Sequence, residues 1–248
     1  MKLYYIRHGQ SQNNAGWGDD TYQPSSDPAL TGNGIEQARL LAEFLRNNQE
    51  LHPNQGWDVH NRYGFGLTHL YCSLMERAAH TAAPVARALK IPFVAWPDIH
   101  ETGGIFSRET ETKLSGLPGK PRSYFEKHVP ELSLPADLDE SGWWRNRPFE
   151  SDEERQSRAD RFLADLLARH GDQDGRPEHH VAIVSHGGFF MHLMCAMLKL
   201  PWRQASNNLS SWFLLSNCSI SRFDFVKDEL LICYLNRTDY LPAHLVTG

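Results

Sequence analysis

Residues 3–9 read LYYIRHG, a short apolar run that ends in an arginine, a histidine and a glycine. Residues 181–188 read VAIVSHGG and repeat the arrangement, with a histidine and a glycine directly after an apolar run. Short apolar runs bounded by polar residues and glycine are typical of buried strands. In open α/β sheets, ligands bind beyond the carboxyl ends of the strands. The two histidines therefore predict one paired site at that edge of a sheet.

The rest of the chain alternates between strand-like and helix-like patterns. Thr31 is a typical helix N-cap, and Ser151 with Glu154 forms a capping box, so each marks the start of a helix. Pro84 lies inside a helical pattern and predicts a kink there. We expect strands at 3–6, 67–72, 91–96, 181–184, 212–215, 220–225 and 230–235, and helices at 35–45, 75–89, 151–167 and 188–200. This alternation predicts an α/β fold, a three-layer α/β/α sandwich with a mostly parallel central sheet.

Two stretches do not fit the alternation. Residues 49–66 are rich in turn formers, and residues 99–149 are dominated by glycine, proline, serine and charged residues. A loop-rich span as long as 99–149 is usually a functional lid or an inserted unit. We therefore interpret the chain as a single domain, 1–248, with an insertion or cap at 99–149. The pair Trp143-Trp144 in this insertion either lines a substrate pocket or packs the insertion onto the sheet.

Composition narrows the classes of function. The formal net charge is -5, so there is no basic field that would favour nucleic acid or an anionic membrane surface as a partner. No apolar run approaches the roughly 18 residues that a membrane helix needs. The four cysteines lack CxxC spacing and are expected to be buried free thiols. These features predict a soluble, cytoplasmic protein. The C-terminal hairpin offers a strand that could pair in a homo-oligomer.

The residues at the predicted sheet edge form a chemically coherent set. Arg77 follows the strand at 67–72, so it joins Arg7, His8 and His186 at the carboxyl edge. Guanidinium groups suit phosphate oxygens, and the helix that begins near Gly187 directs N–H groups at the same region. A neutral imidazole can accept a phosphoryl group covalently, while the arginines stabilise its oxygens. The set predicts a small phosphorylated substrate and requires no metal or other cofactor.

A phosphoryl transfer of this kind also needs an acid. Glu101 follows the strand at 91–96 and is placed to protonate the leaving oxygen, although Glu109 and Glu111 are nearby carboxylates. Elsewhere, the consecutive residues His179 and His180 invite a metal interpretation. Consecutive strand residues point to opposite faces, so a solvated loop end is the preferred interpretation for that pair.

The motifs resemble the histidine phosphatase superfamily, the phosphoglycerate mutase-like proteins. The resemblance rests on residues 7–11 (RHGQS) with Asn14, on 30–38 (LTGNGIEQA), on 73–82 (SLMERAAHTA) and on 185–188 (SHGG), and it covers nearly the whole chain. It implies that His8 is the phosphoryl acceptor, that Arg7, Arg77, His186 and Asn14 contact the phosphate, and that Glu101 is the proton donor and later the base.

Two departures bear on the activity. The acidic–threonine pair expected after the tripeptide is Gln10-Ser11, and residues 102–106 (TGGIF) do not resemble the corresponding segment of glycolytic mutases. The sequence therefore predicts a metal-independent phosphomonoesterase that works through a phosphohistidine. A cofactor-dependent mutase of the phosphoglycerate type is the alternative within enzymes, and a non-catalytic phospho-ligand binding protein is the alternative outside them. The substrate itself is not specified by these motifs.

Overall fold

A computed structural model describes residues 1–52, 57–110, 113–172, 177–201 and 213–248. Its centre is a six-stranded sheet in the order β3-β2-β6-β1-β7-β8. The first four strands in that order are mutually parallel, while β7 and β8 form an antiparallel hairpin on β1. The strands are β1 (Lys2–Arg7), β2 (His69–Cys72), β3 (Phe93–Ala95), β6 (His180–Ser185), β7 (Ile220–Val226) and β8 (Glu229–Arg237).

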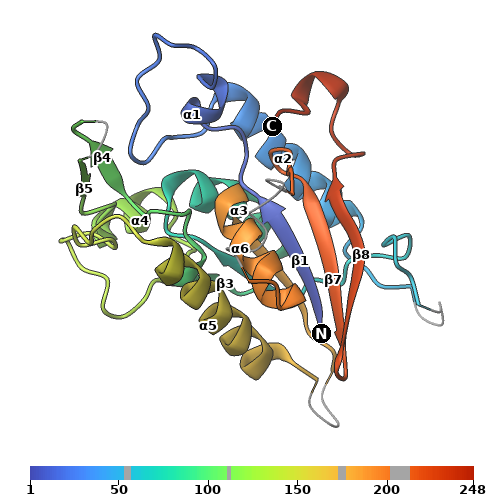
Figure 1. The fold of residues 1–248 in the computed structure, drawn as a ribbon. Helices are drawn as coiled ribbons and strands as arrows, with labels where there is room; N and C mark the ends of the chain where they lie inside the picture. Colours follow the sequence, from blue (N-terminus) through green and yellow to red (C-terminus); the bar gives the residue numbers. More distant parts are fainter. Residues whose placement is uncertain (53–56, 111–112, 173–176, 202–212) are drawn as a thin grey trace.

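Helices cover both faces of the sheet, so the predicted three-layer sandwich is confirmed (Figure 1). On one face α2 packs against α3, and on the other α5 packs against α6. Thr31 accepts a hydrogen bond from the Gly34 N–H, and Ser151 with Glu154 forms a complete capping box, as predicted. The four helices are α2 (Gly32–Asn47), α3 (Glu76–Leu89), α5 (Asp152–His170) and α6 (Gly187–Leu198).

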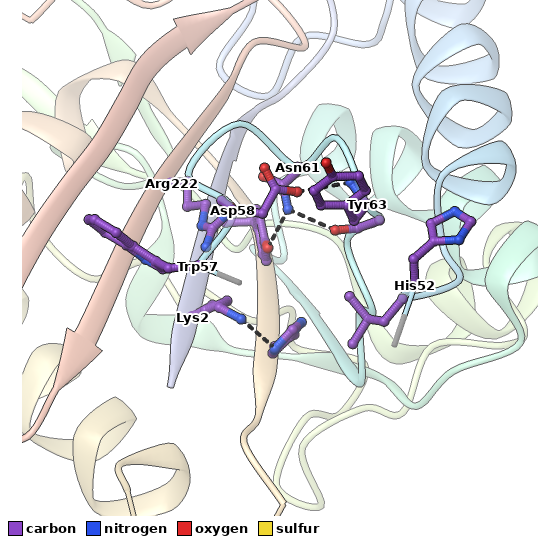
Figure 2. A pocket seen from close by; sticks show the side chains of 11 residues that line it. Lys2, His52, Trp57, Asp58, Asn61, Tyr63 and Arg222 are labelled. Atoms are coloured by element: carbon purple, nitrogen blue, oxygen red, sulfur yellow. Dashed lines mark hydrogen bonds between the residues drawn. The ribbon is translucent and has the colours of Figure 1, made fainter. Parts of the chain in front are cut away.

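Part of the turn-rich excursion at 49–66 covers the amino end of β1. Asn61 donates a hydrogen bond of 2.8 Å to the Tyr4 hydroxyl, and Arg222 of β7 donates to the Asp58 carbonyl. Together with Lys2 these residues line a hollow of about 310 Å³ (Figure 2). The excursion therefore closes the end of the sheet opposite to the one at which the two histidine motifs lie.

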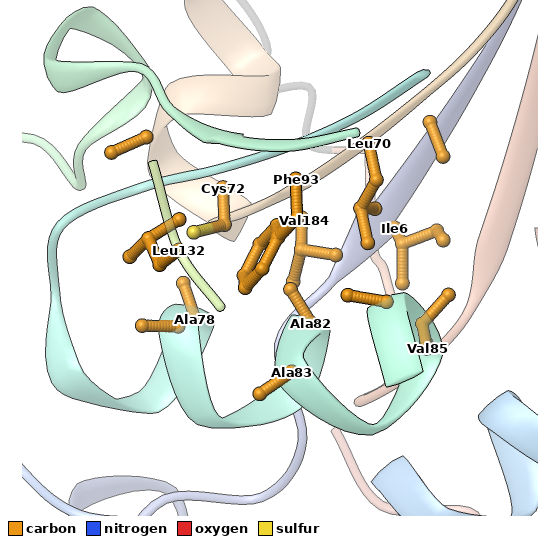
Figure 3. Packing of buried hydrophobic residues seen from close by; sticks show 14 of the residues in the cluster. Ile6, Leu70, Cys72, Ala78, Ala82, Ala83, Val85, Phe93, Leu132 and Val184 are labelled. Atoms are coloured by element: carbon orange, nitrogen blue, oxygen red, sulfur yellow. The ribbon is translucent and has the colours of Figure 1, made fainter. Parts of the chain in front are cut away.

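Small side chains bring α3 close to the sheet. Ala78, Ala82, Ala83 and Val85 are buried against Ile6, Leu70, Cys72, Phe93 and Val184 (Figure 3). Alanine is a strong helix former and presents little bulk, so a helix carrying this face can lie directly on β-branched and aromatic side chains. Helix α3 continues through Pro84 as one element. This packing places Arg77, in the first turn of α3, at the carboxyl edge of the sheet.

The segment 99–149 has more regular structure than its sequence predicts. It follows a 3-10 turn, η1 (Pro97–Ile99), and contains a two-stranded hairpin of β4 (Phe106–Arg108) and β5 (Leu114–Gly116) and the helix α4 (Arg122–His128). Trp143 and Trp144 are 7% and 3% exposed and belong to the same buried cluster as α3. Of the two roles predicted for this pair, packing of the segment onto the sheet is the one that the structure supports.

Three smaller predictions can also be compared with the structure. Residues 213–215 do not form a strand, and Trp212 lies outside the described residues. A short helix, α1 (Gln12–Ala15), occupies the polar loop after β1 and was not predicted. Cys72, Cys195 and Cys218 are buried free thiols, whereas Cys233 is only half-buried. Within the described residues, no helix is long and apolar enough to cross a membrane.

Candidate active site

The register between β1 and β6 brings the two histidine motifs together. Arg7 pairs with Ser185, the last residues of their strands, so His8 and His186 leave the sheet side by side. Their ring centroids are 5.1 Å apart, and the two side chains are 3% and 0% exposed. Gly9 allows the chain to pass close to α2, because a Cβ there would lie 2.7 Å from the Gly34 carbonyl oxygen. The predicted pairing of the two motifs is present.

Hydrogen bonds define the state of the His8 ring. Its Nδ1 lies 2.7 Å from the Gly9 carbonyl oxygen, which can only accept, so Nδ1 carries the proton. Its Nε2 accepts a hydrogen bond of 3.1 Å from Arg77 Nε. In the neutral ring this leaves the Nε2 lone pair directed at a guanidinium group, where an anion would bind. Nε2 is therefore the nucleophilic atom that the site offers.

Arg77 is held by an acidic residue that the sequence analysis did not identify. Asp27, in the loop before α2, lies 3.7 Å from Arg77 Nη1 and accepts a hydrogen bond from the Glu76 N–H at the start of α3. Burial raises the pKa of Asp27 to about 6, and its Oδ2 has no hydrogen-bond partner among the described residues. Asp27 precedes the N-cap Thr31 by four positions, and its contact with Arg77 joins segments far apart in the chain, so no local pattern indicates it. Asp27 positions Arg77.

Several buried polar atoms around His8 lack a partner. Within the described residues, Arg7 Nε and both ring nitrogens of His186 make no hydrogen bond. Arg7 also donates through Nη1 to the Leu215 carbonyl, which fixes its guanidinium beside His8. Leaving buried donors unsatisfied costs about 1–3 kcal/mol each, so such a set indicates a place that a ligand completes. The donors and the two guanidiniums together suit an anion.

Burial and positive charge keep both histidines neutral. Burial, followed by the charges of Arg77 and Arg7, holds the pKa of His8 well below its usual range. Burial, followed by the charge of Arg77 and the His8 ring, does the same to the pKa of His186. A neutral imidazole has a free lone pair, so burial and the two arginines favour the form of His8 that can act as a nucleophile at neutral pH.

Glu101 lies at the amino end of α6, beside the two histidines. Its Oε2 accepts from the Gly188 N–H at 3.2 Å, and its Oε1 accepts from the Phe189 N–H at 3.1 Å. A Cβ at position 188 would lie 2.3 Å from Glu101 Oε1, so the carboxylate occupies a place that a side chain there would displace it from. This corrects one detail of the sequence analysis: two of the helix N–H groups expected to face a bound phosphate are occupied by the protein's own carboxylate.

A buried ion pair holds the segment that carries Glu101. Arg158 of α5 forms a bidentate pair with Glu150, with N–O distances of 2.6 and 2.7 Å, and both side chains are buried. Its Nη1 also donates to the carbonyl oxygens of Asp98 and His100, directly before Glu101. The sequence pattern of α5 did not reveal this role, since a charged residue on an amphipathic helix is usually solvated.

Asn14 is linked to His8 through the side chain of Asn217. Its Oδ1 accepts from Ser11 and from Asn217, and Asn217 also donates a hydrogen bond of 3.0 Å to the His8 carbonyl. A contact from Asn14 to phosphate would therefore come from its Nδ2. Gly187 stands at the start of α6, where a Cβ would have Arg7 Nε at 3.8 Å as its nearest neighbour. The structure thus gathers Arg7, His8, Asn14, Arg77, Glu101, His186 and Gly187 at one edge of the sheet.

Other candidate residues lie elsewhere. Glu109 sits in the exposed β4–β5 hairpin and is paired with Lys113, and Glu111 lies outside the described residues. Two basic residues of the segment 99–149 are paired with carboxylates: Lys120 with Glu76, the residue before Arg77, at 2.8 Å, and Arg122 with Glu126. The hollow shown in Figure 2 is lined by Lys2, the first residue of β1, so it lies at the opposite end of that strand from His8.

Known proteins resemble this chain along most of its length. A "Probable phosphoglycerate mutase GpmB" from Enterobacter sp. is 28% identical over 242 residues, which are 93% of this chain and 88% of that protein. The alpha-ribazole phosphatase from Shigella flexneri superposes with a TM-score of 0.57 at 21% identity, covering 100% of this chain and 98% of the other. A phosphoserine phosphatase mutant from Entamoeba histolytica, solved with phosphoserine, gives 0.56 at 20% identity, covering 97% and 99%.

The two structural similarities establish the fold alone. The family model of the histidine phosphatase superfamily (branch 1) matches residues 3–53 and 59–238, which include both histidine motifs, Arg77 and Glu101. The match spans most of the sequence and agrees with the arrangement of the sheet edge. The chain belongs to the histidine phosphatase superfamily.

Proposed function

We propose that this protein is a phosphomonoesterase in which His8 Nε2 accepts the phosphoryl group. The observation that carries the proposal is the buried His8 ring, whose Nε2 lone pair is directed at Arg77. When a phosphate oxygen replaces Nε2 as the acceptor of the Arg77 hydrogen bond, the lone pair becomes available for in-line attack. Arg7, Arg77 and His186 then stabilise the charge on the phosphoryl oxygens.

The reaction proceeds in two displacements. In the first, His8 Nε2 bonds to phosphorus, the bond from phosphorus to the leaving oxygen breaks, and protonated Glu101 gives that oxygen its proton. In the second, a water oxygen bonds to phosphorus, the P–Nε2 bond breaks, and the Glu101 carboxylate takes the proton from the water. The Gly188 and Phe189 N–H groups hold the Glu101 side chain at the amino end of α6, next to His186. These hydrogen bonds favour the carboxylate form, which is the form that the second displacement uses.

The charges on the inserted segment favour hydrolysis over phosphoglycerate isomerisation. A mutase must hold a bisphosphorylated carboxylate, which calls for cations beyond those that bind one phosphate. Lys113, Lys120 and Arg122 are each already paired with a carboxylate of the protein. This arrangement supports a substrate with a single strongly anionic group. A similar protein is named as a probable phosphoglycerate mutase, and this similarity keeps the isomerisation of phosphoglycerate as the second candidate reaction.

The test is a comparison of the wild-type protein with His8→Ala on an aryl phosphate. We expect the substitution to abolish hydrolysis, and rapid quench of the wild type to trap an acid-labile phosphoenzyme that the variant lacks. Normal turnover by His8→Ala would exclude the mechanism. Isomerisation of phosphoglycerate that depends strongly on 2,3-bisphosphoglycerate would assign the mutase reaction. Tight phosphate binding without a phosphoenzyme would indicate a binding protein. A panel of phosphorylated metabolites then identifies the substrate.

A further inference from the structure

Three histidines gather at the end of the sheet opposite to His8. His69 begins β2, His170 ends α5, and His179 directly precedes β6. Their ring centroids are 4.6, 4.7 and 5.1 Å apart, and one ligand nitrogen from each lies within 4.8 Å of the other two. His170 is buried and the other two are half-buried. In Figure 1 the end of α5 lies at the same end of the molecule as the amino terminus.

This arrangement corrects the expectation of a solvated loop end at His179 and His180. His180 is 4% exposed, and its Nδ1 faces the Phe65 carbonyl, while His179 faces His170. The opposite directions of the two side chains are as predicted. The sequence analysis missed the cluster because its other two members come from β2 and α5, far away in the sequence.

We propose that His69, His170 and His179 bind a divalent transition-metal ion, for which zinc is the best-suited occupant. Zinc binds histidine nitrogen at about 2.0–2.1 Å in tetrahedral geometry, so ligand nitrogens lie roughly 3.4 Å apart. The Nδ1 atoms of His170 and His179 are 2.9 Å apart, so a small outward rotation of the rings makes room for the ion. Three imidazoles suit zinc and its neighbours cobalt, nickel and copper.

Hydrogen bonds prepare His69 to be a ligand. The Thr68 hydroxyl donates to the His180 carbonyl at 3.1 Å, so towards His69 Nδ1, at 2.8 Å, it acts as an acceptor. Nδ1 therefore carries the proton, and the lone pair of His69 is on Nε2. Histidines that bind metal usually donate their second N–H to an oxygen in this way, which fixes the ring orientation.

His170 has an equivalent partner. Its Nε2 lies 2.9 Å from the Tyr71 hydroxyl oxygen, and its Nδ1 faces His179. In the tautomer with the proton on Nε2, His170 donates to Tyr71 and its Nδ1 becomes a ligand. The contact between the two Nδ1 atoms is then replaced by two bonds to the ion. The contact between the two Nδ1 atoms places a proton on one of them, so binding needs that ring to carry its proton on its own Nε2 instead.

Charged side chains next to the cluster have partners of their own. The Arg169 guanidinium lies over the Trp96 ring, 4.2 Å from its centroid, and Glu178 beside His179 is paired with Lys2. Three imidazole nitrogens bind the ion, and water completes its coordination. The ion would clamp α5 to β2 and to the start of β6.

Zinc ion alone is the probe for the test. Calorimetric titration of the wild type should give one site per chain, and zinc at about a hundred times its Kd should raise Tm by roughly 5–10 °C. His170→Ala and His179→Ala should each lose both effects. His179→Ala changes a half-buried residue outside the strands, so it keeps the test valid if His170→Ala fails to fold. His60→Ala removes an exposed histidine elsewhere and should behave as the wild type.

Two further measurements separate this site from the phosphate site, where His8 and His186 are also close. His8→Ala should bind zinc as the wild type does, and cobalt bound to the wild type should show the visible absorption of a tetrahedral ion. The proposal is overturned if binding persists in His179→Ala, if no binding occurs in the wild type, or if binding disappears in His8→Ala.

Discussion

At the scale of single residues, His8 derives its chemistry from its neighbours. The Gly9 carbonyl holds the proton on Nδ1, and Arg77 Nε faces the lone pair on Nε2. Burial and two guanidiniums keep the ring neutral. A histidine on the surface would be partly protonated near neutral pH, and its tautomer would be free to change. The surroundings therefore hold the imidazole in one tautomer and in its neutral form, as the proposed nucleophilic role requires.

The role of Arg77 can be tested by titration of His8. In Arg77→Gln the cation next to Nε2 is lost, so the pKa of His8 should rise towards 6.5, by on the order of one pH unit. NMR titration of the ring measures this, with the signal assigned by its absence in His8→Ala. Arg87→Gln, which removes an exposed arginine of the same helix, should leave the titration unchanged. An unchanged or lower pKa in Arg77→Gln would contradict the assigned contact.

At the scale of elements, the amino end of α6 organises the site. Its Gly188 and Phe189 N–H groups bind the Glu101 carboxylate, and Gly187 faces Arg7. In addition, Arg158 of α5 donates hydrogen bonds to the carbonyl oxygens of Asp98 and His100, which shortly precede Glu101 in the chain. Two helices on one face of the sheet therefore place the proposed proton donor at the edge where β1 and β6 end.

The adjacent glycines of α6 provide a matched pair of variants. In Gly188→Ala the new Cβ would lie 2.3 Å from Glu101 Oε1, so the carboxylate must move, whereas in Gly187→Ala the nearest atom is 3.8 Å away. General acid catalysis typically contributes 10²–10⁴-fold. We expect Gly188→Ala to lower kcat at least roughly tenfold on an alkyl phosphate and much less on an aryl phosphate, whose leaving group needs no proton. Equal losses for the two glycine variants, or for the two substrates, would argue against Glu101 as the acid.

At the scale of the whole molecule, neutral histidines are buried at a positive edge of a protein whose formal net charge is -5. His8, His100 and His186 are 3%, 2% and 0% exposed, and burial lowers the pKa of each well below 6.5. In the unfolded chain the same residues bind protons as the pH falls through about 6.5. The unfolded state therefore takes up more protons than the folded state on acidification.

Stability should consequently fall as the pH is lowered below 6.5. Between pH 7 and pH 5.5, each of these three histidines should lower the free energy of unfolding by about 1 kcal/mol. Asp27 acts in the opposite direction, because its pKa is raised to about 6 and the folded state gains its proton first. It is one group against these three histidines and against His170 and His192, whose pKa values are lowered to about 4. Urea unfolding at the two pH values should show that the free energy of unfolding is lower at pH 5.5 by at least about 2 kcal/mol. His60→Ala should keep this loss, and His186→Phe should reduce it. Equal stability at both pH values would refute the account.

The local patterns predicted most of the elements but not all of the contacts. Caps at Thr31 and Ser151 and the apolar runs of β1 and β6 identified their elements, because hydrogen-bonding side chains and hydrophobic periodicity act over a few residues. Residues 99–149 were less predictable, since Phe125 of α4 packs in the buried cluster that contains Trp143 and Trp144, and Phe106 of the hairpin packs against Phe149.

The sequence by itself determined the chemical groups of the site, because two strands that each end in a histidine and a glycine carry those groups to one edge of any parallel sheet. Only the tertiary structure decided how the groups are held: Asp27 against Arg77, Arg158 behind Glu101, and His170 beside His69 and His179. These contacts join elements far apart in the chain. The distances between such elements, and the burial of the residues that join them, depend on how the sheet and its helices pack. A local sequence pattern carries no information about that packing.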